Sequence, residues 1–351
     1  MSDVEAGNPG EARQSRWWSS FYISKRQIEA LIGSACLALL FLLWMGNDLY
    51  RQDLVTFGCV YAMVALGMYI PLVLSGGMSV AYNSYFAVGA YAVAMVASTA
   101  SLPLLSAAPI AIVVAALVAA VIGFGCKGLT GYHLAVATLA VAQASDRLLV
   151  QADSITGGST GIGGIPRLSL FGLQLDRKPL LAIGLVLVCV LAIAVNRLRD
   201  SVWGIGLRLQ RDAPLAAEAC GFPTELNRIV SLSIGAAIAC LGGAFYALVN
   251  QFIIPESFTL AIVFTVIFIP ILGGAQSAWG CVVGAALVMI VNEAGSYFNI
   301  SGSLVFGAGV LAILLIAPSG FLGLAYGIFH VREQTRSRGC LKPGEGVGND
   351  Q

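Results

Sequence analysis

Apolar runs alternate with short polar segments along most of the chain. Several runs approach the ~20 residues that an α-helix needs to cross a bilayer. We therefore predict an all-α, polytopic integral membrane protein with about ten transmembrane or discontinuous helices. The runs lie at about 29–46, 54–74, 79–99, 103–124, 131–150, 179–195, 229–249, 258–272, 278–294 and 303–317.

The polar segments divide the chain into three parts and leave one long loop. Residues 1–28 form a tail of basic and aromatic side chains, residues 29–317 form the transmembrane domain, and residues 318–351 form a second tail. Between two of the runs, residues 196–228 make the longest charged segment. We expect this loop to lie at the membrane surface, because its charged side chains are costly to place in a bilayer.

One part of the loop is predicted to form a short helix from Asp212 to Cys220. Asp212 is placed to cap the amino end, and Pro214 falls where a missing N–H costs nothing. Gly221 is placed to end the helix. A surface helix held between two spans would suit docking to a cytosolic partner.

Basic residues are distributed unequally between the two sides of this arrangement. Fourteen of the 19 Lys and Arg residues lie in the two tails, at Lys127 or in loop 196–228, and four lie on the opposite side. Excess Lys and Arg in short loops marks the cytoplasmic face of a membrane protein. Both termini and loop 196–228 are therefore predicted to be cytoplasmic, and residues 151–178 to face the outside.

Composition supports a membrane protein and excludes several other classes. Hydrophobic residues make up 58% of the chain and charged residues 11%, against roughly 25% charged residues in soluble domains. The net charge of +1 argues against a nucleic-acid partner. The eight cysteines show no CxxC spacing, so neither a disulfide framework nor a metal site is predicted.

Glycine pairs interrupt the apolar runs at a few places, notably Gly76–Gly77 and Gly273–Gly274. Irregular backbone at membrane depth occurs only where it is buried in protein or lines a cavity. The breaks favour discontinuous helices of the kind that build transport sites. Helix packing alone is the alternative for any single glycine, and Gly280 with Gly284 has the GxxxG spacing that lets helices approach closely.

Two stretches match motifs of enzymes or nucleotide-binding proteins, and a third motif is missing. Residues 157–161 match GxSxG around Ser159, as in serine hydrolases, but the flanking residues are loop-like. The two histidines available as a base are His133 and His330. GxGxxG at 123–128 follows a long apolar run instead of a short strand, so we interpret it as a chance match, and no GxxxxGK[ST] occurs. The chain therefore has no P-loop for ATP hydrolysis, and an intramembrane hydrolase stays a minor alternative.

A few ionisable or polar groups fall inside the apolar runs. Asp146 and Arg147 lie near the end of one run, where they could either anchor the helix at the interface or line a pathway. Asn83 and Glu293 are weaker candidates. No series of acidic residues follows several runs, which makes a proton-coupled secondary transporter a second choice.

Several stretches resemble one family of transporters. They are SVAYNSYFAVGAY (79–91), GYHLAVATLA (131–140), ITGGSTGIGGIP (155–166), RDAPLAAEACGFP (211–223), PESFT (255–259), ILGGAQSAWGCVVGAAL (271–287) and APSGFLG (317–323). Over about residues 55–324 the chain is similar to the LivM-type permease subunit of branched-chain amino acid ABC importers. Ala81, Tyr82, Thr130 and His133 replace the residues usual at their positions. These departures leave the substrate open between branched-chain amino acids, other amino acids, and urea or short amides.

The resemblance implies a transport subunit that is not itself an enzyme and binds no cofactor. ATP would be used by two separate ATP-binding subunits. A second permease subunit and a periplasmic substrate-binding protein would complete the importer. Its place would be the bacterial inner membrane, in contact with lipid. A stand-alone secondary transporter or channel is the alternative from another class.

Two groups of residues are the candidate sites. The movement of the ATP-binding subunits would reach the spans through the surface helix and its flanks, at Arg211, Asp212, Ala213, Ala216, Ala217, Glu218 and Gly221. The substrate path is expected at the broken segments, at Gly76, Gly77, Ser79, Asn83, Gly273 and Gly274.

Overall fold

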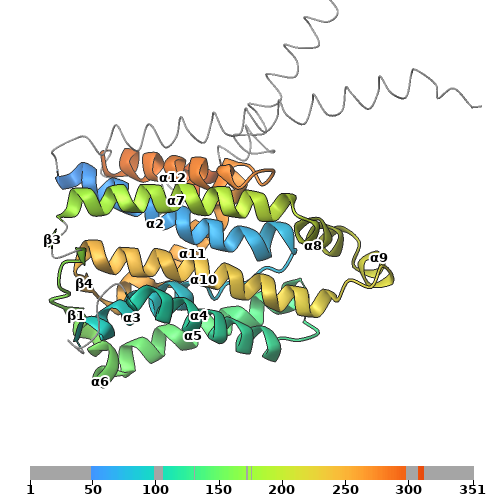
Figure 1. Cartoon of the computed structure of the whole chain (residues 1–351), viewed down its shortest axis with the longest axis horizontal. Coiled ribbons are helices and arrows are strands. Elements are labelled where there is room, and N and C mark those ends of the chain that lie inside the picture. The colour runs from blue at the N-terminus through green and yellow to red at the C-terminus, as the bar shows by residue number, and fades with distance from the viewer. Residues whose placement is uncertain are drawn as a thin grey trace, which may run out of the picture.

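The computed structural model describes residues 49–98, 106–129, 131–170, 173–174, 176–297 and 307–311. Within these ranges long helices run roughly side by side, and short strands lie at one end of the bundle (Figure 1). The long helices are α2 (Leu49–Tyr69), α3 (Tyr82–Ser98), α4 (Ala107–Gly125), α5 (Tyr132–Gln151), α7 (Arg177–Asp200), α10 (Thr224–Asn250), α11 (Leu260–Gly273) and α12 (Trp279–Tyr297). The shorter elements are η1 (Ile70–Leu74), α6 (Asp153–Thr156), η3 (Gly158–Thr160), β1 (Ile162–Gly163), β2 (Ser169–Leu170), β3 (Leu173–Gln174), α8 (Val202–Asp212), α9 (Pro214–Ala219), β4 (Phe252–Ile253) and η4 (Pro255–Phe258).

The helices have the length and composition of membrane spans. In the described part of the chain, 5 helical segments are long and apolar enough to cross a bilayer, and Trp279–Glu293 is a shorter apolar helix. The all-α membrane fold predicted from the sequence is thus confirmed. The predicted run at 29–46, most of the run at 303–317, and the tails at 1–28 and 318–351 lie outside the described residues.

Small residues face inward on the peripheral helix α4. The buried positions recur every four residues and are Ala107, Ala111, Ala115, Ala119 and Gly123. Val113, Leu117 and Val121 are exposed on the same helix. Helices in lipid gain little from hydrophobic burial against one another, so close packing of small residues is what holds them together. The face of α4 with large side chains is therefore suited to lipid.

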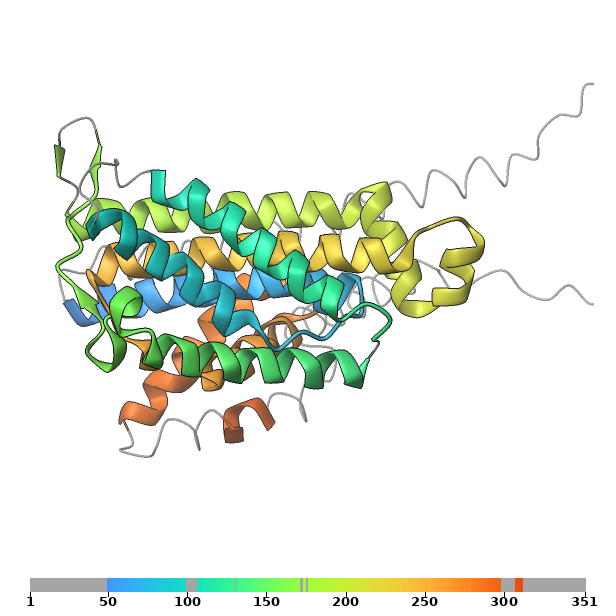
Figure 2. The same cartoon turned by 90° about the horizontal axis from the view of Figure 1, so that it is seen from below.

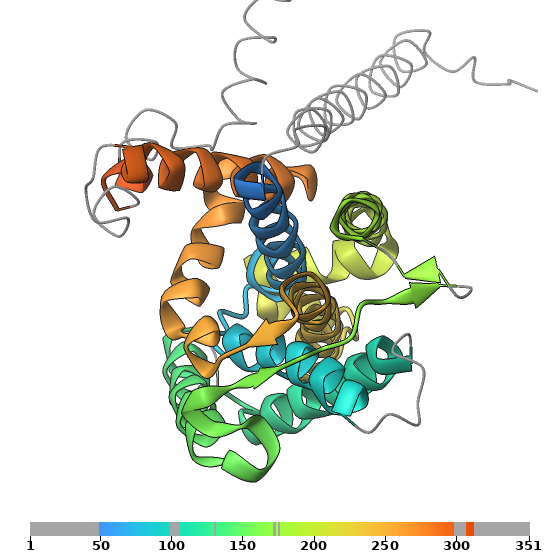
Figure 3. The same ribbon diagram turned by 90° about the vertical axis from the view of Figure 1, so that its left-hand side faces the viewer.

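Helix α10 lies at the centre of the bundle and packs against α2, α3, α4 and α7 (Figure 3). A Cβ atom on Gly243 would collide with the carbonyl oxygen of Phe86 in α3, and one on Gly89 would collide with that of Cys240. The backbones of α3 and α10 therefore touch directly. At Gly67, the backbone of α2 approaches α10 in the same way.

The chain leaves α2 through an irregular passage before α3 begins. Pro71 has no N–H to donate and its ring crowds the preceding turn, and the helix widens into the π-helical segment η1 around it. Residues 75–81, which we call the buried break, then form no regular helix and are mostly buried. The N–H of Gly77 donates to the carbonyl of Pro71 at 2.8 Å. The interruption predicted at Gly76–Gly77 is thus present.

Three glycines hold α11 and α12 backbone to backbone. A Cβ atom on Gly273 would collide with the carbonyl oxygen of Gly280, and one on Gly284 would collide with that of Ile269. Gly274, with a φ of 110°, follows the end of α11 and begins the turn between the helices. The close approach predicted from the GxxxG spacing is confirmed.

The two ends of the bundle differ in structure. Helices α8 and α9 project beyond one end, on the right in Figure 1, while α6 and the strands lie at the other (Figures 1 and 2). There β1 pairs antiparallel with β4, with Ile162 opposite Ile253. β2 and β3 form a second antiparallel ladder. Loop 196–228 and segment 151–178 thus lie at opposite ends, as the charge pattern predicts. We call these the arm end and the ladder end.

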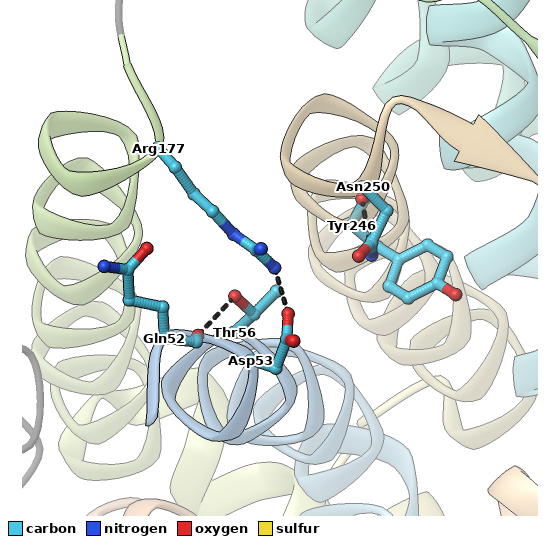
Figure 4. Close-up of polar contacts among 6 residues, drawn as sticks. All are labelled: Gln52, Asp53, Thr56, Arg177, Tyr246 and Asn250. Atoms are coloured by element: carbon cyan, nitrogen blue, oxygen red, sulfur yellow. Dashed lines mark hydrogen bonds and ion pairs between the residues drawn. The ribbon is translucent and has the colours of Figure 1, made fainter. Parts of the chain in front are cut away.

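An ion pair fastens α7 to α2 at the ladder end. Arg177, the first residue of α7, extends toward Asp53 in α2 and contacts its carboxylate (Figure 4). On the same part of α2, the Thr56 hydroxyl donates to the carbonyl of Gln52 at 2.8 Å. Both charged side chains of the pair are partly exposed. Such a pair orients the two helices more than it stabilises them.

Candidate functional site

The long charged loop contains two helices where the sequence predicted one. Ser201 caps α8, since its hydroxyl accepts from the N–H of Gly204 at 3.2 Å. α8 ends at Asp212 because Ala213 precedes Pro214 and is driven out of the helical region, to φ −146° and ψ 76°. Asp212 therefore closes α8 and does not cap α9. The capping role predicted for Asp212 is wrong.

Helix α9 ends as the sequence predicts. Gly221 has a φ of 78°, a left-handed conformation that glycine adopts freely. Its N–H donates to the carbonyl of Glu218 at 2.9 Å, and the N–H of Phe222 donates to that of Ala217 at 3.0 Å. These are the two bonds of a Schellman motif. The Phe222 ring then packs directly on Gly206 of α8, where no side chain obstructs it.

Helices α8 and α9 form one projecting unit, residues 201–223, which we call the arm. Two hydrogen bonds fasten it to the start of α10. The indole N–H of Trp203 donates to Asn227 Oδ1 at 2.8 Å. The Thr224 hydroxyl donates to the carboxylate of Glu218 at 2.8 Å. Glu218, which was predicted to contact a partner, is thus engaged within the subunit.

The arm is also fastened to the buried break. Arg211 Nη1 donates to the carbonyl of Val73 at 2.6 Å. The side-chain amide of Gln210 donates to the Ser75 hydroxyl at 3.3 Å. A Cβ atom on Gly76 would lie 2.7 Å from Cγ of Arg211, so the arginine stem lies against bare backbone. The structure therefore joins Arg211, a predicted coupling residue, to Gly76, a predicted path residue.

Arg211 is held in position by its neighbour in sequence. Its guanidinium donates to the two carboxylate oxygens of Asp212 at 2.8 and 3.2 Å. These hydrogen bonds lower the pKa of Asp212 from its ordinary value, which keeps the carboxylate ionised. With further N–H groups committed to Asp212, the guanidinium is oriented toward the carbonyl of Val73.

The turn between α4 and α5 meets the start of α10 at the same end of the bundle. Lys127 Nζ lies 3.3 Å from the carboxylate of Glu225. The guanidinium of Arg228 donates to the carbonyl of Leu129. The stem of Arg228 also runs past the buried break, since a Cβ atom on Gly77 would lie 3.6 Å from its Cγ. The arm, the α4–α5 turn and the buried break therefore adjoin one another.

Helix α9 presents part of its surface away from the bundle. The side chain of Leu215 is 82% exposed, and Ala216 and Cys220 are exposed on the same segment. Ala217 is buried and Ala213 is half-buried. Ala217, a predicted coupling residue, thus packs inside the subunit and is not available to a partner. Leu215 was not among the predicted contact residues.

The end of the buried break and the start of α3 meet α5 through polar groups. The N–H of Val80 donates to the Thr138 hydroxyl at 3.0 Å. The Asn83 amide donates to the Asp146 carboxylate at 2.7 Å and to the carbonyl of Ala142 at 3.3 Å. Asn83, a predicted path residue, therefore lies against Asp146, whose role the sequence left open between interface and pathway.

The turn that contains the Gly273–Gly274 pair lies against the carboxyl end of α2, where η1 begins. The hydroxyl of Tyr69, the last residue of α2, donates to the carbonyl of Ala275 at 3.1 Å. Gly76 and Gly77 lie just after η1, which continues α2. Both predicted glycine pairs are thus close to the last two turns of the α2–η1 helix.

The residues that suggested a hydrolase are far apart. Ser159 is exposed in the turn η3 at the ladder end, and His133 lies at the start of α5, at the arm end. The 20 residues of α5 separate them by roughly 30 Å at 1.5 Å per residue. His330 lies outside the described residues. Over the ranges that the structure describes, no group of His, Cys, Asp and Glu could hold a metal ion.

Comparison with known proteins gives a family match and a few relatives. Residues 50–318 match the family described as branched-chain amino acid transport system / permease component. The high-affinity branched-chain amino acid transport system permease protein LivM of Salmonella typhimurium is 28% identical over 320 residues, covering 84% of this chain and 73% of that protein. The LivM protein of Escherichia coli is 28% identical over 294 residues, covering 77% and 69%.

More distant similarities extend over most of the chain. The probable branched-chain amino acid transport permease protein LivH of Methanocaldococcus jannaschii is 26% identical over 302 residues, covering 80% of this chain and 94% of that protein. Among solved structures, PsaBC from Streptococcus pneumoniae in complex with Fab covers 80% of this chain and 96% of its own, with 17% identity and a TM-score of 0.44. The family match includes the arm, the buried break and helices α3 to α12. The chain therefore belongs to the permease-component family of branched-chain amino acid transport systems.

Proposed function

We propose that this permease subunit carries branched-chain amino acids across the bacterial inner membrane, and that separate ATP-binding subunits drive it through the arm. The chain itself hydrolyses no ATP in this scheme. A second permease subunit would complete the pathway, and a periplasmic substrate-binding protein would deliver the substrate. One observation carries the proposal: Arg211 contacts both the carbonyl of Val73 and the backbone of Gly76, and so joins an exposed arm to a broken membrane helix.

The attachments of the arm suit the transmission of movement. The arm is held by α10 on one side and by the buried break on the other, while Leu215 on α9 is open to a partner. A partner that moves α9 would displace both attachments together. Val73 lies in η1, where the regular helical bonding is already interrupted. Such a segment changes conformation at lower cost than a regular helix.

The proposed substrate path runs along the buried break and the turn after α11. It comprises Gly76, Gly77, Ser79, Asn83, Gly273 and Gly274. Irregular backbone in a membrane has polar groups that need partners other than lipid. A displacement of Val73 by the arm would act directly on this path, because Gly76 follows it by three residues.

The arm end is proposed to face the cytoplasm, together with both termini. The support is the excess of Lys and Arg in loop 196–228 and at Lys127 in the α4–α5 turn, which lie together at this end. The ladder end would then face the periplasm, where a substrate-binding protein could dock.

Two cysteine positions give a direct test of this orientation. In a variant that retains Cys220 alone, a membrane-impermeant thiol reagent should label the protein only from the cytoplasmic side, because Cys220 is exposed on the arm. In a cysteine-free background, Ser159→Cys should be labelled only from the periplasmic side, because η3 lies at the ladder end. Labelling of intact cells and of inside-out vesicles measures both. The reverse pattern would refute the orientation.

A substitution of Arg211 tests transmission through the arm. We expect Arg211→Ala to lower uptake and binding-protein-stimulated ATP hydrolysis together by at least about tenfold, because a hydrogen bond from a charged group contributes roughly 1.5–3 kcal/mol. Removing the stem also leaves the backbone at Gly76 uncovered. The measurement is made on the assembled complex in proteoliposomes, with co-purification of the ATP-binding subunits showing that assembly is intact.

Arg197 provides the matched control for this experiment. It carries the same charge near the arm, at the end of α7, and its side chain is exposed. Arg197→Ala should therefore keep both activities near those of the unmodified complex. If the Arg211→Ala complex kept normal uptake and normal stimulated ATP hydrolysis, the contact between Arg211 and Val73 would have no part in the mechanism.

A stand-alone transporter or channel, or a permease for urea or short amides, is the competing proposal. A transporter that needs no partner has no use for an arm carrying an exposed leucine beyond the end of its bundle. The urea and amide alternative differs in its substrate, because urea and short amides are uncharged whereas an amino acid carries an ammonium and a carboxylate group.

A further inference from the structure

The start of α3 gathers buried polar atoms that have no hydrogen-bond partner within the described residues. They are the hydroxyl of Ser79 and the Oδ1 atom of Asn83. Each of the two residues is only 1% exposed. Buried polar atoms in proteins are almost always hydrogen-bonded, and an unpaired one costs stability. Two such atoms four residues apart call for a ligand that can pair with them.

A carboxylate lies against the side chain of Asn83. Asn83 is the one hydrogen-bond partner of Asp146 among the described residues, and it uses a single carboxylate oxygen, Oδ1. The second oxygen is therefore open to another donor. The adjacent Arg147 contributes a positive charge, but among the described residues Asp146 makes no ion pair within 4.0 Å. A carboxylate on a membrane helix is costly unless it is paired, so this side of the site favours a cation.

The amino end of α3 supplies the opposite polarity. α3 begins at Tyr82, directly after the buried break. In its first turn the N–H of Ser84 donates to the carbonyl of Ala81 at 3.1 Å, while the N–H groups of Tyr82 and Asn83 have no partner inside the helix. Such an end carries a partial positive charge and favours an anion. Ser79 precedes it by three residues, and its hydroxyl can donate to the same anion. The negative carboxylate of Asp146 and the partly positive amino end of α3 are thus neighbours, because Asn83 in the first turn of α3 donates to Asp146.

We propose that Asp146, Asn83, Ser79 and the start of α3 bind the zwitterionic head group of an α-amino acid in transit. The ammonium group donates to Asp146 and to Oδ1 of Asn83, while the carboxylate accepts from the Ser79 hydroxyl and from the N–H groups of Tyr82 and Asn83. This assignment rests on the proposed transport of amino acids. It makes urea and short amides poor ligands, because they carry neither charge.

The test measures binding of radiolabelled leucine to the assembled complex in nanodiscs, without the binding protein. Two competitors each retain one half of the head group: leucinamide keeps the ammonium and 4-methylpentanoate keeps the carboxylate. Asp146→Asn should weaken leucine and leucinamide by at least about tenfold and leave 4-methylpentanoate unchanged, as expected for loss of one charge-assisted hydrogen bond. Ser79→Ala should weaken leucine and 4-methylpentanoate and leave leucinamide unchanged.

Asp176→Asn is the matched control, because Asp176 is an exposed acid that pairs with Arg167 at the same end of the molecule as the outer half of α5. The complex that contains the Asp176→Asn variant should bind leucine, leucinamide and 4-methylpentanoate as the unmodified complex does. Equal loss of all three in Asp146→Asn would show that Asp146 supports the fold, and would overturn the assignment.

Stimulation of ATP hydrolysis by the binding protein is measured on the same preparations. If it is intact and the unmodified complex shows no saturable leucine binding, the head-group site is refuted while the proposed coupling stands. If stimulation is absent although leucine binds, the site stands and the proposed coupling through the arm fails.

Discussion

Replacing Gly243 by leucine is expected to remove most of the folded protein from the membrane. Even a Cβ atom at this position would collide with the carbonyl oxygen of Phe86, and the obstacle is backbone, which cannot rotate away. Overpacking a core usually costs about 1–3 kcal/mol, and here α3 and α10 would have to separate along their length. A loss above about 3 kcal/mol is a large share of the 5–15 kcal/mol that typical domains have. The measurement is the amount of monodisperse protein after solubilisation, with its thermal midpoint.

Gly125 provides the control for this prediction. It is also a helical glycine, at the end of α4, and a Cβ atom there would meet nothing within 4 Å. Gly125→Leu should therefore give a normal yield. A Gly243→Leu protein with unchanged yield and midpoint would show that the α3–α10 contact is looser than the structure has it.

Replacing Leu215 by aspartate is expected to abolish assembly with the ATP-binding subunits and leave the subunit itself folded. Leu215 is 82% exposed, so its own subunit gains little from it. Loss of a hot-spot side chain at the centre of an interface costs at least about 2 kcal/mol, roughly 30-fold in affinity, and the aspartate adds the cost of burying a charge. Pull-down of the ATP-binding subunits by the solubilised permease measures this, beside the thermal midpoint of the permease.

The conservative variant Leu215→Met completes the experiment, because methionine keeps an apolar side chain of similar volume at this position. It should assemble within a fewfold of the unmodified protein. If Leu215→Asp assembles equally well, the partner grips the arm at some other surface, and the exposed leucine serves contact with lipid.

The elements that the sequence predicts well are those in which local pattern and tertiary packing agree. The apolar runs that fall within the described residues form helices, and the GxxxG spacing of Gly280 and Gly284 gives a close contact, since small residues allow backbone approach. Helix α8 was missed because it is amphipathic and charged, and so has no apolar run. A signal was present: Ser201 stands where it caps the first turn.

The contacts that make up the candidate sites were beyond sequence reasoning. Asn83 and Asp146 are 63 residues apart, and their pairing depends on where the buried break sets the start of α3 beside α5. The bond from Arg211 to the carbonyl of Val73 spans 138 residues. The sequence singled out Asn83, Asp146 and Arg211 one by one, but it could not show that Asn83 meets Asp146. The partner of Arg211 is a backbone carbonyl, which has no signature in a sequence.

Helix α10 is suited to transmit movement as a rigid body, because its backbone lies directly against those of α2 and α3. Its far end is fixed: Asn250 is followed within three residues by the pairing of β4 with β1. Its near end carries the hydrogen bonds to the arm. The 27 residues of α10 span about 40 Å, so a tilt of about 5° around the ladder would carry the near end through roughly 3.5 Å. A tilt about the ladder end would thus displace the arm by several ångströms, while the ladder end would hardly move.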